Sequence, residues 1–243
     1  MRFGVICFSL LFLFVAGARA GDFAFEEPIG FSPDGRYFGF EEYGIQDGSG
    51  FPYSNIFVID LETDTYAPET PVRVRIDSEK ASLKSARDQA RKQARTVLNR
   101  FDLTFPAVVV YARGLGDFSN FKEGLTAPLV ASIAIPSPGD PTGPAADQFD
   151  LILSHVPAKS VATCPLQSIG FLLEKVDPDG KRRFVHRDDK ILLSRGCPLK
   201  YRISKVFVPN GGKGHFAAVL ISVFQTGFEG LDRRFVVFPV TIR

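Results

Sequence analysis

Short β-type runs separated by turn residues extend along most of this chain, and they constrain its fold more than any other feature. Runs rich in valine, isoleucine and phenylalanine cover Asn55 to Leu61, Phe105 to Ala112, Leu129 to Ile135 and His215 to Phe224. Clusters of glycine, proline, asparagine and aspartate lie at the ends of these runs, and such residues form the turns at the ends of β-strands. About a dozen such runs occur, and one segment has helical periodicity. The pattern predicts a mainly β protein with one long helix.

The helical segment covers about residues 78–101, and we expect Asp77 or Ser78 to cap its start. Its apolar residues recur at three- and four-residue steps and are mostly alanine, which would let the helix lie close to a sheet. Its opposite face is basic, which allows a second interpretation, contact with an anionic envelope surface. The residues for that contact would be Lys84, Arg87, Arg91, Lys92 and Arg95.

The first twenty residues have the pattern of an export signal. Met1 and Arg2 precede an apolar run from Phe3 to Gly17, and Ala18-Arg19-Ala20 supplies small residues for cleavage after Ala20. The run is shorter than the roughly 20 residues that span a bilayer as a helix. We therefore expect residues 21–243 to form a single β-rich exported domain without a transmembrane segment.

The net charge bears on nucleic-acid binding, and the cysteine count bears on disulfide formation. Without Arg2 and Arg19 the 29 basic residues become 27, against 27 acidic residues, so no global nucleic-acid footprint is expected. Two cysteines remain in the mature chain, Cys164 and Cys197, and an even count in an exported chain favours a disulfide. Two buried free thiols are the alternative.

Two segments of the chain show turn and strand patterns in the same order. Phe31 to Phe40 begins with Ser32-Pro33-Asp34-Gly35, and Ile56 to Thr63 follows after a glycine-rich stretch. Residues 31–63 resemble one blade of the TolB-like and WD-type β-propellers, in which Asp60 would make strand-end hydrogen bonds. In both segment 29–66 and segment 203–242, the pattern predicts a turn, a strand, a glycine-rich loop and a second strand, in that order. The resemblance implies propeller-blade-like antiparallel sheets, with a β-sandwich as the alternative, and the proline- and glycine-rich segment 136–146 is predicted as a surface loop.

A wider resemblance covers nearly the whole mature chain. It rests on Phe31 to Gly35, Glu41 to Gly44, Asp47 to Phe51, Ser194 to Pro198 and Gly227 to Gly230. Together these segments resemble a family of predicted secreted bacterial proteins whose function is unknown. The resemblance implies export to the periplasm of a Gram-negative cell, and it implies no activity, cofactor or catalytic residue.

Catalytic and metal-binding patterns are weak in this sequence. It contains no G-x-S-x-G, H-E-x-x-H or phosphate-binding glycine loop. Asp177, Asp179 and Asp188 match three positions of a calcium loop, but Lys181 and Arg182 stand where an oxygen ligand and glycine are needed. Asp177 to Gly180 therefore predicts a hairpin turn, and we expect no metal and no cofactor.

The favoured function is a non-catalytic binding or interaction module of the bacterial envelope. Its partner would be an envelope protein, a peptide or a polysaccharide, because aromatic and carboxylate side chains gather in one polar stretch. The candidate binding residues are Glu41, Glu42, Tyr43, Asp47, Phe51 and Tyr53. A wide hairpin whose aromatic rings cap the core is the alternative reading of this stretch. The competing function is a periplasmic hydrolase whose active site gathers His155, His186 or His215 from separate loops.

Overall fold

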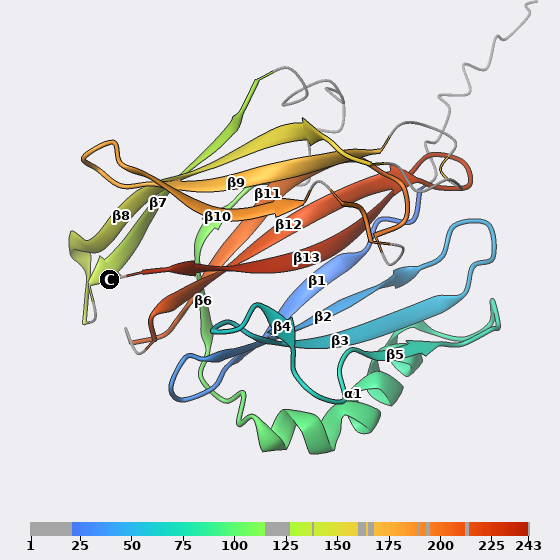
Figure 1. Ribbon diagram of the computed structural model, residues 1–243. Helices are drawn as coiled ribbons and strands as arrows, with labels where there is room; N and C mark the ends of the chain where they lie inside the picture. Colours follow the sequence, from blue (N-terminus) through green and yellow to red (C-terminus); the bar gives the residue numbers. More distant parts are fainter. Residues whose placement is uncertain are drawn as a thin grey trace, which may run out of the picture.

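Three antiparallel sheets and one helix stack as four layers in the computed structural model (Figure 1). The structure describes residues 21–114, 127–137, 139–159, 164, 168–188, 190–192, 195–211 and 214–242, with only the backbone of 141–142. The predicted leader, residues 1–20, lies outside this part of the chain. The order of the layers is outer sheet, middle sheet, helix-side sheet and helix.

Two of the sheets each take consecutive strands of the chain, and the middle sheet joins one strand from the centre of the chain to three strands from its C-terminal part. The helix-side sheet contains β1 (Phe25–Phe31), β2 (Tyr37–Ile45), β3 (Pro52–Asp60), β4 (Thr65–Tyr66) and β5 (Val72–Arg75), the last two both paired with β3. The outer sheet has the order β10 (Arg182–Asp188), β9 (Ile169–Val176), β8 (Asp140–Pro157) and β7 (Leu129–Ser137). The middle sheet has the order β13 (Leu231–Thr241), β12 (Phe216–Thr226), β11 (Pro198–Pro209) and β6 (Ala107–Ala112).

The middle sheet is covered on both faces, which explains the unbroken apolar run of β12. Val219 and Ile221 point into the core shared with the outer sheet, where Phe171 also lies. Ala218 and Leu220 point into the core shared with the helix-side sheet. Strands buried on both faces lose the alternation of apolar and polar residues that marks a half-exposed strand.

Aromatic rings fill the core between the middle and helix-side sheets. The ring centroids of Phe38 and Phe207 are 5.3 Å apart, and those of Phe40 and Phe57 are 4.8 Å apart. Such pairs contribute about 0.5–1.5 kcal/mol beyond the area that they bury. This aromatic layer joins the two sheets face to face.

The structure supports a mainly β fold with one helix but not the propeller blade. Segment 29–66 lies in the helix-side sheet and segment 203–242 in the middle sheet, and these sheets stack instead of radiating around an axis. The stacking matches the sandwich alternative. A turn followed by two strands specifies a hairpin, and hairpins occur in many β architectures. The local role of Asp60 does hold, because its carboxylate accepts hydrogen bonds from Arg36 at 2.6 Å and from the Glu62 N–H at 3.1 Å.

Helix α1 (Leu83–Arg100) starts later than the sequence predicts. Ser82 is its cap, and the Ser82 hydroxyl accepts a hydrogen bond from the Ser85 N–H at 3.1 Å, whereas residues 79–80 form a turn. The alanine stripe behaves as expected. Ala86, Ala90 and Ala94 are fully buried against the side of the helix-side sheet that carries Ile56 and Val74.

The predicted loop 136–146 is instead the closed end of a hairpin between β7 and β8. Proline cannot donate to a ladder, and the register shifts on both sides of Pro136. Gly139 has a φ of +80°, and the Ser137 hydroxyl donates to the Pro144 carbonyl at 2.7 Å. β7 is an edge strand of the outer sheet, which tolerates these irregularities.

Two other predictions in the C-terminal half are confirmed. The turn before Lys181 joins β9 and β10 as a hairpin, with Gly180 at a φ of +83°. Cys164 and Cys197 form a disulfide with a Cα–Cα distance of 5.5 Å. The bond ties the connection between β8 and β9 to the start of β11.

Candidate functional site

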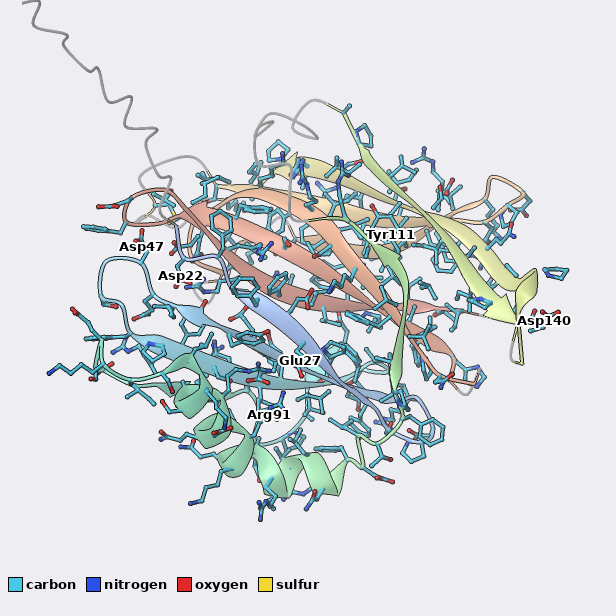
Figure 2. All side chains as sticks on the ribbon, turned by 180° about the vertical axis from the view of Figure 1, so that it is seen from behind. Asp22, Glu27, Asp47, Arg91, Tyr111 and Asp140 are labelled. Carbon is cyan, nitrogen blue, oxygen red and sulfur yellow. A yellow bond between two sulfur atoms is a disulfide. The ribbon has the colours of Figure 1, made fainter. Side chains whose placement is uncertain are left out.

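Glu41 lies in an internal ion-pair cluster and not on the surface. The Glu41 side chain is fully buried, and it accepts hydrogen bonds from Arg87 at 2.9 Å, Arg91 at 2.7 Å and Ser54 at 2.8 Å. Glu27 completes the cluster by pairing with both arginines, and Figure 2 shows Glu27 and Arg91 between the sheet and α1. Burial alone would raise the pKa of Glu41, but the arginine hydrogen bonds outweigh it and hold the pKa below its ordinary value.

The five basic residues of α1 that were proposed to contact an anionic surface do not all have the same surroundings. Arg87 and Arg91 form ion pairs with Glu41, and Lys84 forms an ion pair with Asp88 at 2.5 Å along the helix. Lys92 and Arg95 are exposed and have no ion pair within the described residues. The five side chains therefore do not act as one exposed cationic face, and contact with an anionic surface stays a prediction.

The other predicted binding residues lie around the loop between β2 and β3. Tyr43 is half-buried beneath Arg87, whose guanidinium carbon is 3.8 Å from the ring centroid. Phe51 is also half-buried. The Asp47 carboxylate accepts a hydrogen bond from the Glu229 N–H at 3.4 Å, so two segments that carry the family resemblance meet at one end of the molecule.

Tyr53 is buried at the floor of a cleft between the helix-side and middle sheets, and Glu42 is buried behind the cleft residue Asn55, whose amide donates a hydrogen bond to it. The strand register places Glu42 beside Asn55, Asn55 beside Arg73, and Tyr53 beside Arg75. All five side chains share the sheet face that turns toward β13. Toward this end of the sheet, polar groups replace the aromatic rings of the core, and the two sheets leave an open space.

We name this space the arginine cleft, with a volume of about 370 Å3. Its wall and floor residues are Gln46, Tyr53, Asn55, Arg73, Val74, Arg75, Asp77 and Arg234. Two of its three guanidinium groups have internal partners. Arg75 pairs with Asp77 at 2.6 Å, and Arg234 pairs with Asp22 at 2.5 Å.

Arg73 carries the uncompensated charge of the arginine cleft. Within the described residues no carboxylate lies at ion-pair distance from its guanidinium, whose carbon is 5.4 Å from the Phe57 ring centroid. Arg73 is exposed to solvent. A planar guanidinium that is held over a ring and open on its other side can bind a carboxylate through two parallel hydrogen bonds.

Two hydrogen-bonded groups lie beneath the cleft, one around Asp22 and one around Glu42. The Tyr53 hydroxyl donates to Asp22 at 2.7 Å, and burial together with that carboxylate raises the pKa of Tyr53. The Glu42 carboxylate accepts hydrogen bonds from the Asn55 amide at 3.1 Å and the Phe235 N–H at 2.9 Å. Complete burial raises the pKa of Glu42, although Arg234 and the N–H of Phe235 oppose the rise. These contacts give the buried polar groups beneath the arginines hydrogen-bond partners.

The sequence prediction included Glu42 and Tyr53 but missed the arginines. The signal for Arg73 and Arg75 was the alternation in residues 72–76, which places both side chains on one face of a strand. Arg234 had no local signal, because its place in the cleft depends on β13 packing over β3 and β5. Asp22 was missed for the same reason.

The histidines of the hydrolase alternative do not gather at one point. His155 and His186 approach the interior around Phe171 and Tyr201, whereas His215 precedes β12, where its carbonyl accepts the Ile242 N–H. Burial lowers the pKa of His186 and raises the pKa of Asp64, 3.8 Å away, to about 6. In the described residues no group of three or more His, Cys, Asp or Glu side chains is placed to hold a metal ion.

The fold and the cleft define a layered β protein with one covering helix and an arginine-lined surface site. The chain belongs to the family described as "Predicted secreted protein (DUF2259)", whose family model matches residues 39–241. No curated protein matches the chain. Among the helices of the described residues, none has the length and apolar character that a membrane span requires.

Proposed function

We propose that this protein is a non-catalytic binding protein of the bacterial periplasm. Its arginine cleft would bind a carboxylate side chain of an acidic segment of another envelope protein. The observation that carries this proposal is Arg73, an exposed guanidinium without an ion-pair partner among the described residues in an open cleft of about 370 Å3. The disulfide, the leader pattern and the secreted family support an oxidising location outside the cytoplasm.

The surroundings of the cleft favour a polypeptide as the ligand. Among the described strands β5 pairs only with β3, so its other edge has backbone groups without a strand partner. An extended peptide can pair with such an edge. The charge of Arg73, unpaired among the described residues, would repel a basic segment there and attract an acidic one. The short length and positive charge of β5 also oppose pairing with a second copy of this chain.

Apolar side chains beside the cleft offer additional contacts. Ile45, the neighbour of the cleft residue Gln46, is 53% exposed, and Phe228 is 78% exposed. A Cβ atom at Gly48 would lie 3.2 Å from Phe228, so the tip of the loop between β2 and β3 lies against this ring. Aromatic side chains of this kind are frequent anchors in protein interfaces.

Binding of a fluorescent acidic peptide to the purified mature protein tests this function. Arg73→Glu is expected to weaken binding at least tenfold, because it replaces an attraction with a repulsion, and added salt should weaken binding to the unmodified protein. Arg95→Glu on the exposed face of α1 is the matched control. Equal affinities of the Arg73→Glu variant and the unmodified protein would refute the proposal.

Two further arms of this experiment separate the alternatives. A loss of binding in Arg95→Glu alone would assign anion binding to the helix. An acidic oligosaccharide that binds while the peptide does not would assign the cleft to a polysaccharide. In envelope extract, the immobilised protein should capture a partner that the Arg73→Glu variant does not capture.

A further inference from the structure

We infer that the arginine cleft binds its anionic ligand together with one proton, which the carboxylate of Glu42 takes up. This inference rests on the proposed function, because it concerns the same cleft and the same class of ligand. It assigns a role to a buried carboxylate that is too deep to touch a partner directly, since Glu42 is 2% exposed.

Glu42 lies directly behind the cleft wall, where it accepts a hydrogen bond from the cleft residue Asn55. It lies in a row of residues that face the middle sheet, with Glu26 on β1, Asn55 on β3 and Arg73 on β5. Its two carboxylate oxygens accept hydrogen bonds from Asn55 at 3.1 Å and from the Phe235 N–H at 2.9 Å. Glu42 therefore cannot turn toward solvent when the charge around it changes.

Charged and titratable groups face Glu42 from every neighbouring strand. They are Glu26 on β1, Tyr53 on β3, Tyr66 on β4, Arg73 on β5, and Arg233 and Arg234 on β13. Glu26 pairs with Lys205 at 2.5 Å, and the Arg233 guanidinium donates to the Ala24 carbonyl at 2.6 Å. The cations that favour the ionised form of Glu42 and also line the cleft are Arg234 and Arg73.

A bound carboxylate would compete with Glu42 for these two cations. The ligand brings a second negative charge to Arg73, and two carboxylates that share a site cannot both remain ionised without cost. Burial already disfavours the ionised form of Glu42. When the ligand arrives, Glu42 therefore takes one proton from solvent and becomes a neutral carboxylic acid, and no other bond forms or breaks.

The neighbours of Glu42 can accommodate the proton. The Phe235 N–H would continue to donate to one oxygen of the acid. The new O–H group can donate to the Asn55 side-chain oxygen once the Asn55 amide rotates by half a turn, because an amide offers a donor on one side and an acceptor on the other. The neutral acid thus remains fully hydrogen-bonded in its buried position.

Calorimetry in two buffers with different ionisation heats tests this inference on the unmodified protein. The probe is a short acidic peptide, whose own carboxylates stay ionised above about pH 5. We expect net proton uptake on binding and an affinity that rises by up to tenfold for each unit that the pH falls. Binding without proton exchange, at an affinity that is constant between about pH 5 and 8, would overturn the inference and leave the proposed function intact.

Glu42→Gln identifies the group that takes up the proton. Glutamine keeps the shape and the neutral hydrogen-bonding pattern of the protonated acid, so this variant should bind the peptide with a flat pH profile. Glu69→Gln, at an exposed glutamate, is the matched control and should retain the pH dependence. If Glu42→Gln folds and still takes up a proton, Glu42 is not the group. If the Glu42→Gln variant does not fold, the two-buffer measurement on the unmodified protein alone decides whether a proton is taken up on binding. An unchanged affinity of the Arg73→Glu variant would instead refute the proposed function.

Discussion

Replacing Arg87 and Arg91 with methionine, singly and together, tests whether the cluster around Glu41 acts as one unit. Methionine keeps most of the apolar stem and removes the charge. The Arg91 side chain is 48% exposed and that of Glu27 is 45% exposed, so solvent screens their attraction. We therefore expect Arg91→Met to lower the free energy of unfolding by about 1 kcal/mol.

Arg87 contributes more because it is more buried. Its side chain is 24% exposed, donates to Glu41 through two nitrogens and lies over the Tyr43 ring. Loss of these contacts should cost about 2 kcal/mol. In each single variant the other arginine still neutralises Glu41.

The double variant leaves Glu41 buried with only the Ser54 hydroxyl as a donor among the hydrogen bonds described above. An uncompensated buried charge costs about 3–5 kcal/mol. We therefore expect the double variant to lose about 5 kcal/mol, roughly 2 kcal/mol more than the sum of the single losses. Urea denaturation at neutral pH measures all three values, and urea is preferred because guanidinium chloride would screen the charges.

The pH dependence gives an independent check on the same cluster. The folded-state pKa of Glu41 is lowered, so its ion pairs stabilise the protein above the unfolded-state value of 4.5, and this stability is lost as the pH falls through the folded-state pKa. The deficit of the double variant should therefore be largest at neutral pH and should shrink in acid. Additive losses within about 0.5 kcal/mol, or a deficit that does not change with pH, would refute this reasoning.

Two further predictions concern the disulfide and the alanine stripe. Replacing Cys164 and Cys197 with alanine should lower the free energy of unfolding by about 3–4 kcal/mol, because the bond closes a loop of 33 positions in the unfolded chain, and an unchanged urea midpoint would contradict this. Ala90→Leu should destabilise the protein by about 1–3 kcal/mol in thermal unfolding, since Ala90 is fully buried where α1 meets the sheet. Gln89→Leu, on the exposed side of the same turn, is its control, and equal effects of the two variants would show that the helix does not pack as described.

Local sequence signals predicted individual elements well. The hairpin before Lys181 and the strand after His215 depend on residues that are neighbours in sequence, as do the alanine stripe of α1 and the disulfide count. The start of the helix was placed too early, because Asp77, Ser78 and Ser82 can all act as caps and only the path of the chain after β5 selects Ser82. The end of the β7–β8 hairpin was missed because an edge strand accepts prolines that a central strand would exclude.

The candidate site was only partly visible in the sequence. The polar stretch from Glu41 to Tyr53 identified Tyr53, which lies at the floor of the arginine cleft, and Glu42, which is buried behind the cleft residue Asn55. The same stretch suggested that Glu41 contacts a partner, whereas Glu41 accepts hydrogen bonds from α1. Neighbouring glutamates on a strand point to opposite faces, so one reaches the helix and the other reaches β13.

The sequence by itself determined the secreted family, the mainly β composition with one helix, and the pairing of Cys164 with Cys197, because each depends on composition or on short-range pattern. The tertiary structure alone decided that the sheets stack in layers, and that Asp22, Arg73 and Arg234 meet around Glu42 and Tyr53. Those residues lie up to 212 positions apart, as the contact between Arg234 and Asp22 shows. The physical reason is that sheet packing depends on the combined shape and burial of many strand faces, which no single stretch of sequence encodes.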